Sequence, residues 1–186
     1  YVNGRNDLTE APETLRRIGR FVGKRLQKFA ESLDMHAKLC LIGLPTAATP
    51  IASAVGLECG IATRVMREVR KQSHGMHGRW VEGDPAAPYA YCTIDNVVTA
   101  GTTKREKFAQ LAEDGYDPMQ MIHVILVDRG QGAVEALRQE GYRVLVIFEL
   151  SDILHVMKEH DCWPEHVMQE AIEEVSARKK EAPTPT

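Results

Sequence analysis

The sequence predicts one α/β domain with a mostly parallel sheet, and three observations lead to this fold class. Short apolar segments that suit buried strands alternate with segments of helical periodicity. A chain of 186 residues with 44% hydrophobic content can bury one core. Four strand segments are mostly apolar, as parallel strands covered on both faces are, and they lie at residues 38–43, 89–94, 121–127 and 143–148. We expect a single domain over residues 1–180 and a disordered tail at 181–186.

Helix signals fill the intervals between these strands. Thr9 is expected to cap a first helix, which has Pro12 in its first turn and an apolar stripe that runs to Leu33. Small residues at 51–57 form a second helix, and residues 61–69 alternate enough to form a further strand. In the helix after residue 103, Phe108 and Leu111 share a face and Lys104, Arg105, Glu106 and Lys107 lie around them. Three more helices are expected around Val134 and Leu137, over 150–160, and from Pro164 onward.

Composition excludes several classes of function. The formal charge of −3 and the pI of about 6.2 leave no basic footprint for nucleic acid. No apolar run approaches the roughly 20 residues that cross a bilayer, and no signal-peptide pattern is present. The four cysteines lie far apart without a Cys-x-x-Cys pair, so we expect reduced thiols and a cytoplasmic protein.

Small hydroxyl residues follow the strand at 89–94 and precede a helix. The segment at residues 95–103 reads Asp-Asn-Val-Val-Thr-Ala-Gly-Thr-Thr. A strand, a turn of small residues and a helix aim backbone N–H groups and a helix N-terminus at an anion. Asp95 can accept hydrogen bonds from sugar hydroxyls, and Thr99, Thr102 and Thr103 can donate to a phosphate. The segment therefore predicts a pocket for a phosphorylated sugar, with an ordinary strand–helix turn as the alternative.

This segment resembles the phosphoribosyl-pyrophosphate (PRPP) motif of type I phosphoribosyltransferases, and it is similar to the version in orotate phosphoribosyltransferases. One residue departs from the pattern, because the family usually has a second acid where this chain has Asn96. Asn keeps one acceptor and adds a donor, which changes the electrostatics of the pocket. The resemblance assigns PRPP binding to Asp95, Asn96, Val97, Val98, Thr99, Ala100, Gly101, Thr102 and Thr103.

The loop after the strand at 38–43 is also rich in small residues. It reads Gly-Leu-Pro-Thr-Ala-Ala-Thr-Pro at residues 43–50, and small residues let a ligand come close to the backbone. Tight packing of a helix on a sheet would explain the same composition. The loop resembles the pyrophosphate-binding loop of the family, which implies that Pro45, Thr46 and Ala47 contact the diphosphate.

Residues 70–83 are basic, polar and interrupted by glycine, so we expect an exposed, mobile loop. Such a loop can close over a polyanion, although a solvated hairpin tip is the ordinary alternative. It resembles the catalytic lid of orotate phosphoribosyltransferases, with Val-Glu-Gly at 81–83. The family's second lid lysine has no counterpart here, and its His-Gly pair matches either residues 74–75 or residues 77–78. The resemblance implies that the catalytic residues are Arg70, Lys71, His74, His77 and Asp95.

A fourth segment, Asp-Arg-Gly-Gln-Gly at residues 128–132, follows the strand at 121–127. A capping Asp beside a surface Arg is one explanation. The segment also resembles the family's orotate-binding segment, whose Arg pairs with the orotate carboxylate through its planar, permanently charged guanidinium. The implied orotate site consists of Thr99 and Arg129.

All four segments fall at strand ends, where parallel α/β sheets bind their ligands. The resemblance implies transfer of phosphoribose from PRPP to orotate, giving orotidine 5′-monophosphate and pyrophosphate. It also implies a type I phosphoribosyltransferase fold, Mg²⁺ held mainly by PRPP, and a homodimer whose lid reaches the neighbouring subunit's site. Two alternatives remain open, namely a PRPP-binding regulatory relative with impaired catalysis and a phosphoribosyltransferase for another base.

Overall fold

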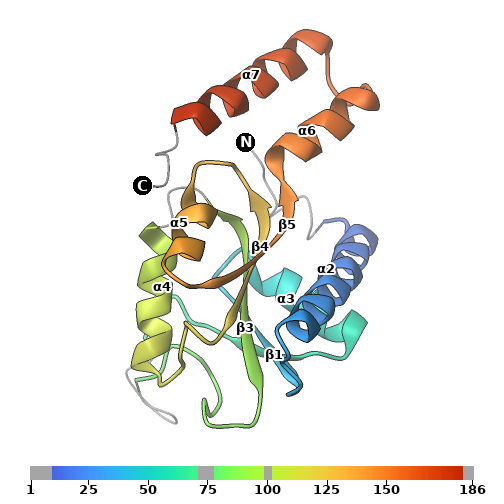
Figure 1. Cartoon of the computed structure of the whole chain (residues 1–186). Helices are drawn as coiled ribbons and strands as arrows, with labels where there is room; N and C mark the ends of the chain where they lie inside the picture. The colour runs from blue at the N-terminus through green and yellow to red at the C-terminus, as the bar shows by residue number, and fades with distance from the viewer. Residues whose placement is uncertain (1–9, 71–77, 99–101, 182–186) are drawn as a thin grey trace.

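The computed structural model describes residues 10–70, 78–98 and 102–181. In this part of the chain, five strands form one sheet in the order β2-β1-β3-β4-β5, and all of its pairings are parallel (Figure 1). The strands are β1 Leu39–Gly43, β2 Ala62–Val65, β3 Ala90–Val98, β4 Ile122–Asp128 and β5 Arg143–Glu149. The helices are α2 Pro12–Ser32, α3 Thr49–Cys59, α4 Thr102–Glu113, α5 Ala133–Gln139, α6 Leu150–Glu159 and α7 Glu165–Glu181. The predicted α/β class with a mostly parallel sheet flanked by helices is confirmed.

Helices cover both faces of the sheet, so the core forms two layers (Figure 1). Apolar side chains of α2 and α3, including Val22, Leu26 and Val55, pack into one buried cluster. Phe108 and Leu111 of α4 join α5 in the second cluster. Every residue of β4 is buried, as expected for a parallel strand between two helical layers.

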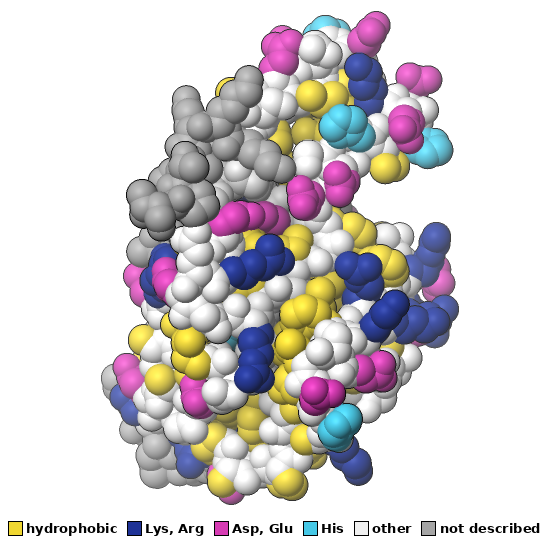
Figure 2. Space-filling view, in the orientation of Figure 1, with side chains coloured by type: hydrophobic (Ala, Val, Ile, Leu, Met, Phe, Trp, Pro, Cys, Tyr) yellow, Lys and Arg dark blue, Asp and Glu magenta, His cyan; other side chains and the backbone are white. Residues whose placement is uncertain are grey.

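The last two helices form an arm beyond the end of β5 (Figure 1). They pack against each other, and Met168 of α7 is almost fully buried there. Figure 2 shows the surface hollowed between this arm and the body below it. None of the helices in the described residues is long and apolar enough to span a membrane.

Three predicted boundaries are wrong. The strand predicted at 89–94 continues to Val98, because parallel pairing with β4 holds Asp95 and Val97 in the ladder despite the low β-propensity of acids. The strand predicted at 61–69 stops at Val65, since Met66 instead makes an antiparallel bridge to Val81. Ala11, and not Thr9, is the N-cap of α2.

At the other end of the chain, α7 extends to Glu181, which places the first residue of the predicted tail in a helix. Residues 182–186 lie outside the described part of the chain. The single domain over residues 1–180 stays a prediction.

A buried histidine on β4 shows how the sheet accommodates a polar group. The Pro118 carbonyl, 2.8 Å away, can only accept, so His123 Nε2 carries the proton and Nδ1 accepts from the Thr93 hydroxyl at 2.8 Å. Phe108 packs on the imidazole with ring centroids 4.0 Å apart. Burial lowers the pKa of His123 to about 4, which keeps the ring neutral at physiological pH.

Because the folded protein takes up this proton less readily than the unfolded chain, stability should fall as pH drops from about 6.5 toward 4. The free energy of unfolding should decrease by about 3 kcal/mol across that window through His123 alone. Urea unfolding of the parent and of His123→Gln at both pH values measures the contribution of His123 to the free energy of unfolding. The exposed His155→Gln is the control. Equal pH dependence in the parent and His123→Gln would contradict the assignment.

Candidate active site

The register of the sheet brings three of the predicted segments to one edge. Gly43 at the end of β1 pairs with Ile94 of β3, and the Leu44 N–H donates to the Ile94 carbonyl at 2.9 Å. Val98 at the end of β3 pairs with Asp128 at the end of β4. The loop after β1, the last residues of β3 and the loop after β4 therefore meet at the carboxyl edge, where parallel sheets bind ligands.

Asp95 lies at the centre of this edge, and both of its carboxylate oxygens have partners. Oδ1 accepts the Asn96 N–H at 2.7 Å. Oδ2 forms an ion pair with Lys104 Nζ, which also lies 3.4 Å from the Val97 carbonyl. The Asp95 side chain keeps 22% of its surface exposed, so its remaining lone pairs can reach a ligand.

Lys104 is the residue of this edge that the sequence analysis missed. It was placed among the charged residues around the apolar face of its helix, but its side chain is only 7% exposed. The signal was present, since Lys104, Phe108 and Leu111 follow the i, i+4, i+7 spacing of one buried helix face. Burial lowers the pKa of Lys104 to about 7.

The loop after β1 leads directly into α3, which packs on the sheet. Within it, Thr46 is exposed, Pro45 and Ala47 are half-buried, and the Pro45–Thr46 peptide bond is cis. A Cβ at Gly43 would lie 3.0 Å from Ala52 Cβ. The small residues therefore allow α3 to pack closely on the sheet. Pro45, Thr46 and Ala47 lie at the carboxyl edge, and their contacts with pyrophosphate stay predictions.

The loop after β4 turns at two glycines with positive φ, Gly130 at 69° and Gly132 at 81°. Asp128 Oδ1 accepts the Gly130 N–H at 3.0 Å, which fixes the turn, and burial raises the pKa of Asp128. Arg129 follows the strand immediately and is half-buried at the carboxyl edge. Asp128 is therefore a turn residue, and the orotate contact of Arg129 stays a prediction.

Arg70, at the start of the predicted lid, lies away from this edge. Its Nε donates to the Gly78 carbonyl, and its Nη1 lies 3.5 Å from Glu113 Oε2 at the last residue of α4. The start of α4 is about 16 Å away along the helix axis, at about 1.5 Å per residue. Within one subunit, Arg70 and Asp95 are therefore not brought together.

Several predicted site residues lie outside the described part of the chain: Lys71, His74, His77, Thr99, Ala100 and Gly101. Thr102 and Thr103 form the beginning of α4. Their predicted contacts stay predictions.

The end of the lid segment is anchored to the end of α4. Asp114 is buried, and its Oδ2 accepts the backbone N–H groups of Trp80 and Val81, each at 2.7 Å. The Trp80 indole donates to Glu113 Oε2 at 2.9 Å. Glu113 and Asp114 thus hold both ends of the lid segment, Arg70 on one side and Trp80–Val81 on the other.

Removing this anchor should loosen the lid base. Asp114→Ala leaves two backbone donors without an acceptor, so we expect a loss of about 2 kcal/mol in the free energy of unfolding. Amide hydrogen exchange at Trp80 and Val81 should become faster. The exposed Asp117→Ala, which removes a hydrogen bond to Met119 N, is the matched control and should cost under about 1 kcal/mol. Unchanged exchange at Trp80 and Val81 in Asp114→Ala would show that the anchor is unimportant.

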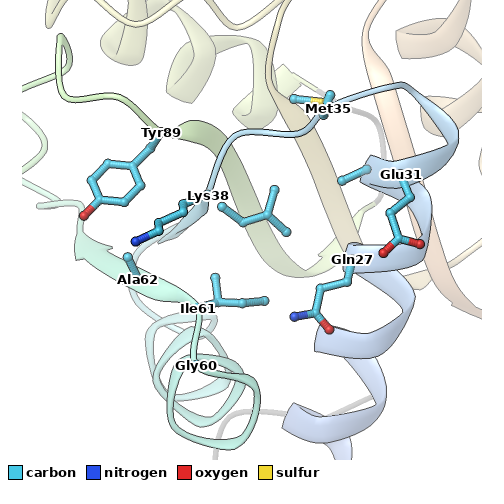
Figure 3. A pocket seen from close by; sticks show the side chains of 10 residues that line it. Gln27, Glu31, Met35, Lys38, Gly60, Ile61, Ala62 and Tyr89 are labelled. Atoms are coloured by element: carbon cyan, nitrogen blue, oxygen red, sulfur yellow. The ribbon is translucent and has the colours of Figure 1, made fainter.

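A separate hollow of about 460 Å³ lies at the opposite edge of the sheet, beside the starts of β1 and β2. Figure 3 shows Gln27 and Glu31 of α2 on one side of it and Lys38 and Tyr89 on the other. None of the predicted site residues lines it. Among the described residues, no group of three or more His, Cys, Asp or Glu side chains is placed to hold a metal ion.

Comparison with known proteins relates the whole chain to one family. No family model matches the chain. The chain is 28% identical to the orotate phosphoribosyltransferase of Pyrococcus furiosus over 151 residues, which cover 80% of this chain and 78% of that protein. It is 31% identical to the orotate phosphoribosyltransferase of Thermosynechococcus vestitus over 147 residues, which cover 76% of this chain and 75% of that protein.

Comparison with solved structures points to the same family. The UMP synthase of Leishmania donovani matches with a TM-score of 0.75 and 25% identity over 97% of this chain, although this covers only 36% of the UMP synthase chain. The orotate phosphoribosyltransferase of Aeropyrum pernix matches with a TM-score of 0.52 and 29% identity over 72% of this chain and 74% of that chain. These structures share the fold described above. Together with the extent and identity of the curated matches, this shows that the chain belongs to the orotate phosphoribosyltransferase family.

Proposed function

We propose that this protein transfers the phosphoribosyl group of PRPP to orotate, giving orotidine 5′-monophosphate and pyrophosphate. One observation carries the proposal beyond family membership. Segments from three distant parts of the sequence meet at one edge of the sheet, around the Asp95 carboxylate. A small-residue loop, a helix N-terminus and a guanidinium at one edge suit a diphosphate, a sugar phosphate and a carboxylated base, respectively.

In this reaction the bond from the anomeric carbon to the diphosphate oxygen breaks, and its electron pair leaves with pyrophosphate. A ring nitrogen of orotate, after losing its proton, forms the new bond to that carbon. The protein must hold both reactants in line, stabilise the leaving charge and exclude water. In our proposal Asp95 accepts the ribose hydroxyls, Arg129 orients the orotate carboxylate, and the backbone of residues 45–47 meets the diphosphate.

Magnesium is part of the proposal as a cofactor held mainly by the oxygens of PRPP itself. Mg²⁺ commonly binds through substrate phosphates and few protein groups. When bound, it supplies charge neutralisation to the diphosphate. We also propose a cytoplasmic location, supported by free cysteines at positions 40, 59, 92 and 162.

We further propose a homodimer in which each lid serves the partner's site. The contact of Arg70 with Glu113 supports this arrangement, because it holds Arg70 at the end of α4 that is remote from its own predicted PRPP segment. A basic lid that is remote from its own site can still neutralise a diphosphate bound to the neighbouring subunit.

Steady-state assays with PRPP and orotate test the activity. We expect equal amounts of orotidine 5′-monophosphate and pyrophosphate, formed only when both substrates are present. Asp95→Asn should lower kcat/KM for PRPP about 10- to 100-fold, because it weakens hydrogen bonds to a charged acceptor. Absence of turnover by a dimeric sample would refute the proposal. PRPP binding without product, measured by calorimetry, would instead indicate the regulatory alternative that Asn96 favours. Assays with a panel of bases test the alternative that the enzyme uses a base other than orotate.

Mixed dimers test the shared lid. A double variant with Arg70→Ala and Lys71→Ala is combined with Asp95→Ala, each being inactive alone. If the lid acts on the partner's site, each mixed dimer has one intact site, and random exchange restores about a quarter of the parental activity. If the lid acts on its own subunit, both sites of a mixed dimer carry a defect and activity stays absent.

A further inference from the structure

Lys104 occupies a position that general physical rules disfavour for a lysine. It lies in the first turn of α4, where the helix dipole repels a cation, and its side chain is 7% exposed. Burial of an ammonium is costly, and a well-packed apolar residue often replaces a buried ion pair without loss of stability. Packing of α4 on the sheet therefore gives no reason for a charge at this position.

The contacts of Lys104 connect it to the PRPP segment. Its ammonium pairs with Asp95 Oδ2 and lies 3.4 Å from the Val97 carbonyl, while Asp95 Oδ1 is held by the Asn96 N–H. A carboxylate offers about four lone-pair positions, and these two contacts leave the others available. Held on both oxygens, the carboxylate is fixed in one orientation before any ligand arrives.

The net charge around Asp95 also affects how strongly a polyanion such as PRPP can bind. When Lys104 is protonated, its charge cancels that of Asp95, and Asn96 adds none. A carboxylate alone would repel the phosphates of PRPP, whereas the paired carboxylate can accept hydroxyl hydrogen bonds without that penalty. The ammonium also adds positive charge at a helix N-terminus, where anions bind.

We propose that Lys104 is a positioning residue for PRPP, whose ammonium orients Asp95 toward the ribose hydroxyls and offsets its charge. This inference rests on the proposed function. It adds a residue of α4 to the segments that the sequence analysis had assigned to PRPP.

The surroundings of Lys104 also predict proton uptake by its amine when PRPP binds. Within the described residues, two ionisable side chains face it, Asp95 from β3 and His123 from β4. Burial lowers the pKa of Lys104 to about 7. His123 stays neutral, because its own pKa is about 4. A bound polyanion favours the charged ammonium, so binding above neutral pH should draw a proton from solution.

Calorimetric titration of the full chain with PRPP at pH 8, in two buffers of different ionisation enthalpy, measures both affinity and proton uptake. The parent should take up about half a proton more than Lys104→Met does, and Lys104→Met should bind PRPP about tenfold more weakly. Lys107→Met, one turn further along the same helix, is the matched control and should behave as the parent does. Equal affinity and equal proton uptake in the parent and Lys104→Met would overturn the inference.

Lys104→Arg separates charge from titration. A guanidinium stays charged at pH 8, so this variant should retain affinity within about threefold and lose the extra proton uptake. If Lys104→Met does not fold, Lys104→Arg tests the inference by itself. Proton uptake in Lys104→Arg equal to that of the parent would then overturn the inference. A parent protein that binds no PRPP refutes the proposed function itself. A parent that binds and turns over PRPP, with unchanged Lys104 variants, refutes only the role of Lys104.

Discussion

The parallel pairing of β3 between β1 and β4 is the constraint on which the site depends. Parallel neighbours must end at the same edge, and the register decides which of their residues meet there. Because Gly43 is opposite Ile94 and Val98 is opposite Asp128, β1 ends next to Asp95 while β4 ends four residues further along β3. The last residues of β3 therefore lie between two loops that come from distant parts of the sequence.

Sequence reasoning could find this edge but not its details. Apolar strands, small-residue loops and helical periodicity are local signals, and they were sufficient for the fold class and for the placement of Pro45 and Arg129 at strand ends. The end of β3 could not be predicted from local signals, because Asp95 and Asn96 are poor strand formers. The strand continues past them because Asp95 and Val97 pair with β4. Tertiary pairing overrides propensity in such positions, which is why the strand was predicted to stop at Ile94.

Lys104 shows a second limit. In the sequence it stands among Arg105, Glu106 and Lys107, a run that usually faces solvent. Arg105 indeed pairs with the exposed Glu140, whereas Lys104 is buried against Asp95. Helical spacing could have separated the two, since only Lys104 shares the face of Phe108 and Leu111. The partner of a buried charge, however, depends on the packing of α4 against β3, which no local pattern encodes.

Helix α4 connects the edge of the sheet that carries Asp95 with the contacts of Arg70 and Trp80. Its first turn carries Lys104, and its last residue, Glu113, contacts Arg70 and Trp80. Phe108 and Leu111 pack the middle of the helix into the core, so the two ends are fixed relative to each other. The buried Asp114 contact fixes the end of the lid segment, while the exposed Arg70–Glu113 pair is of the kind that contributes at most about 1 kcal/mol. The two ends of the segment are therefore held unequally. Breaking the Arg70–Glu113 contact should therefore cost less than separating Trp80 and Val81 from Asp114.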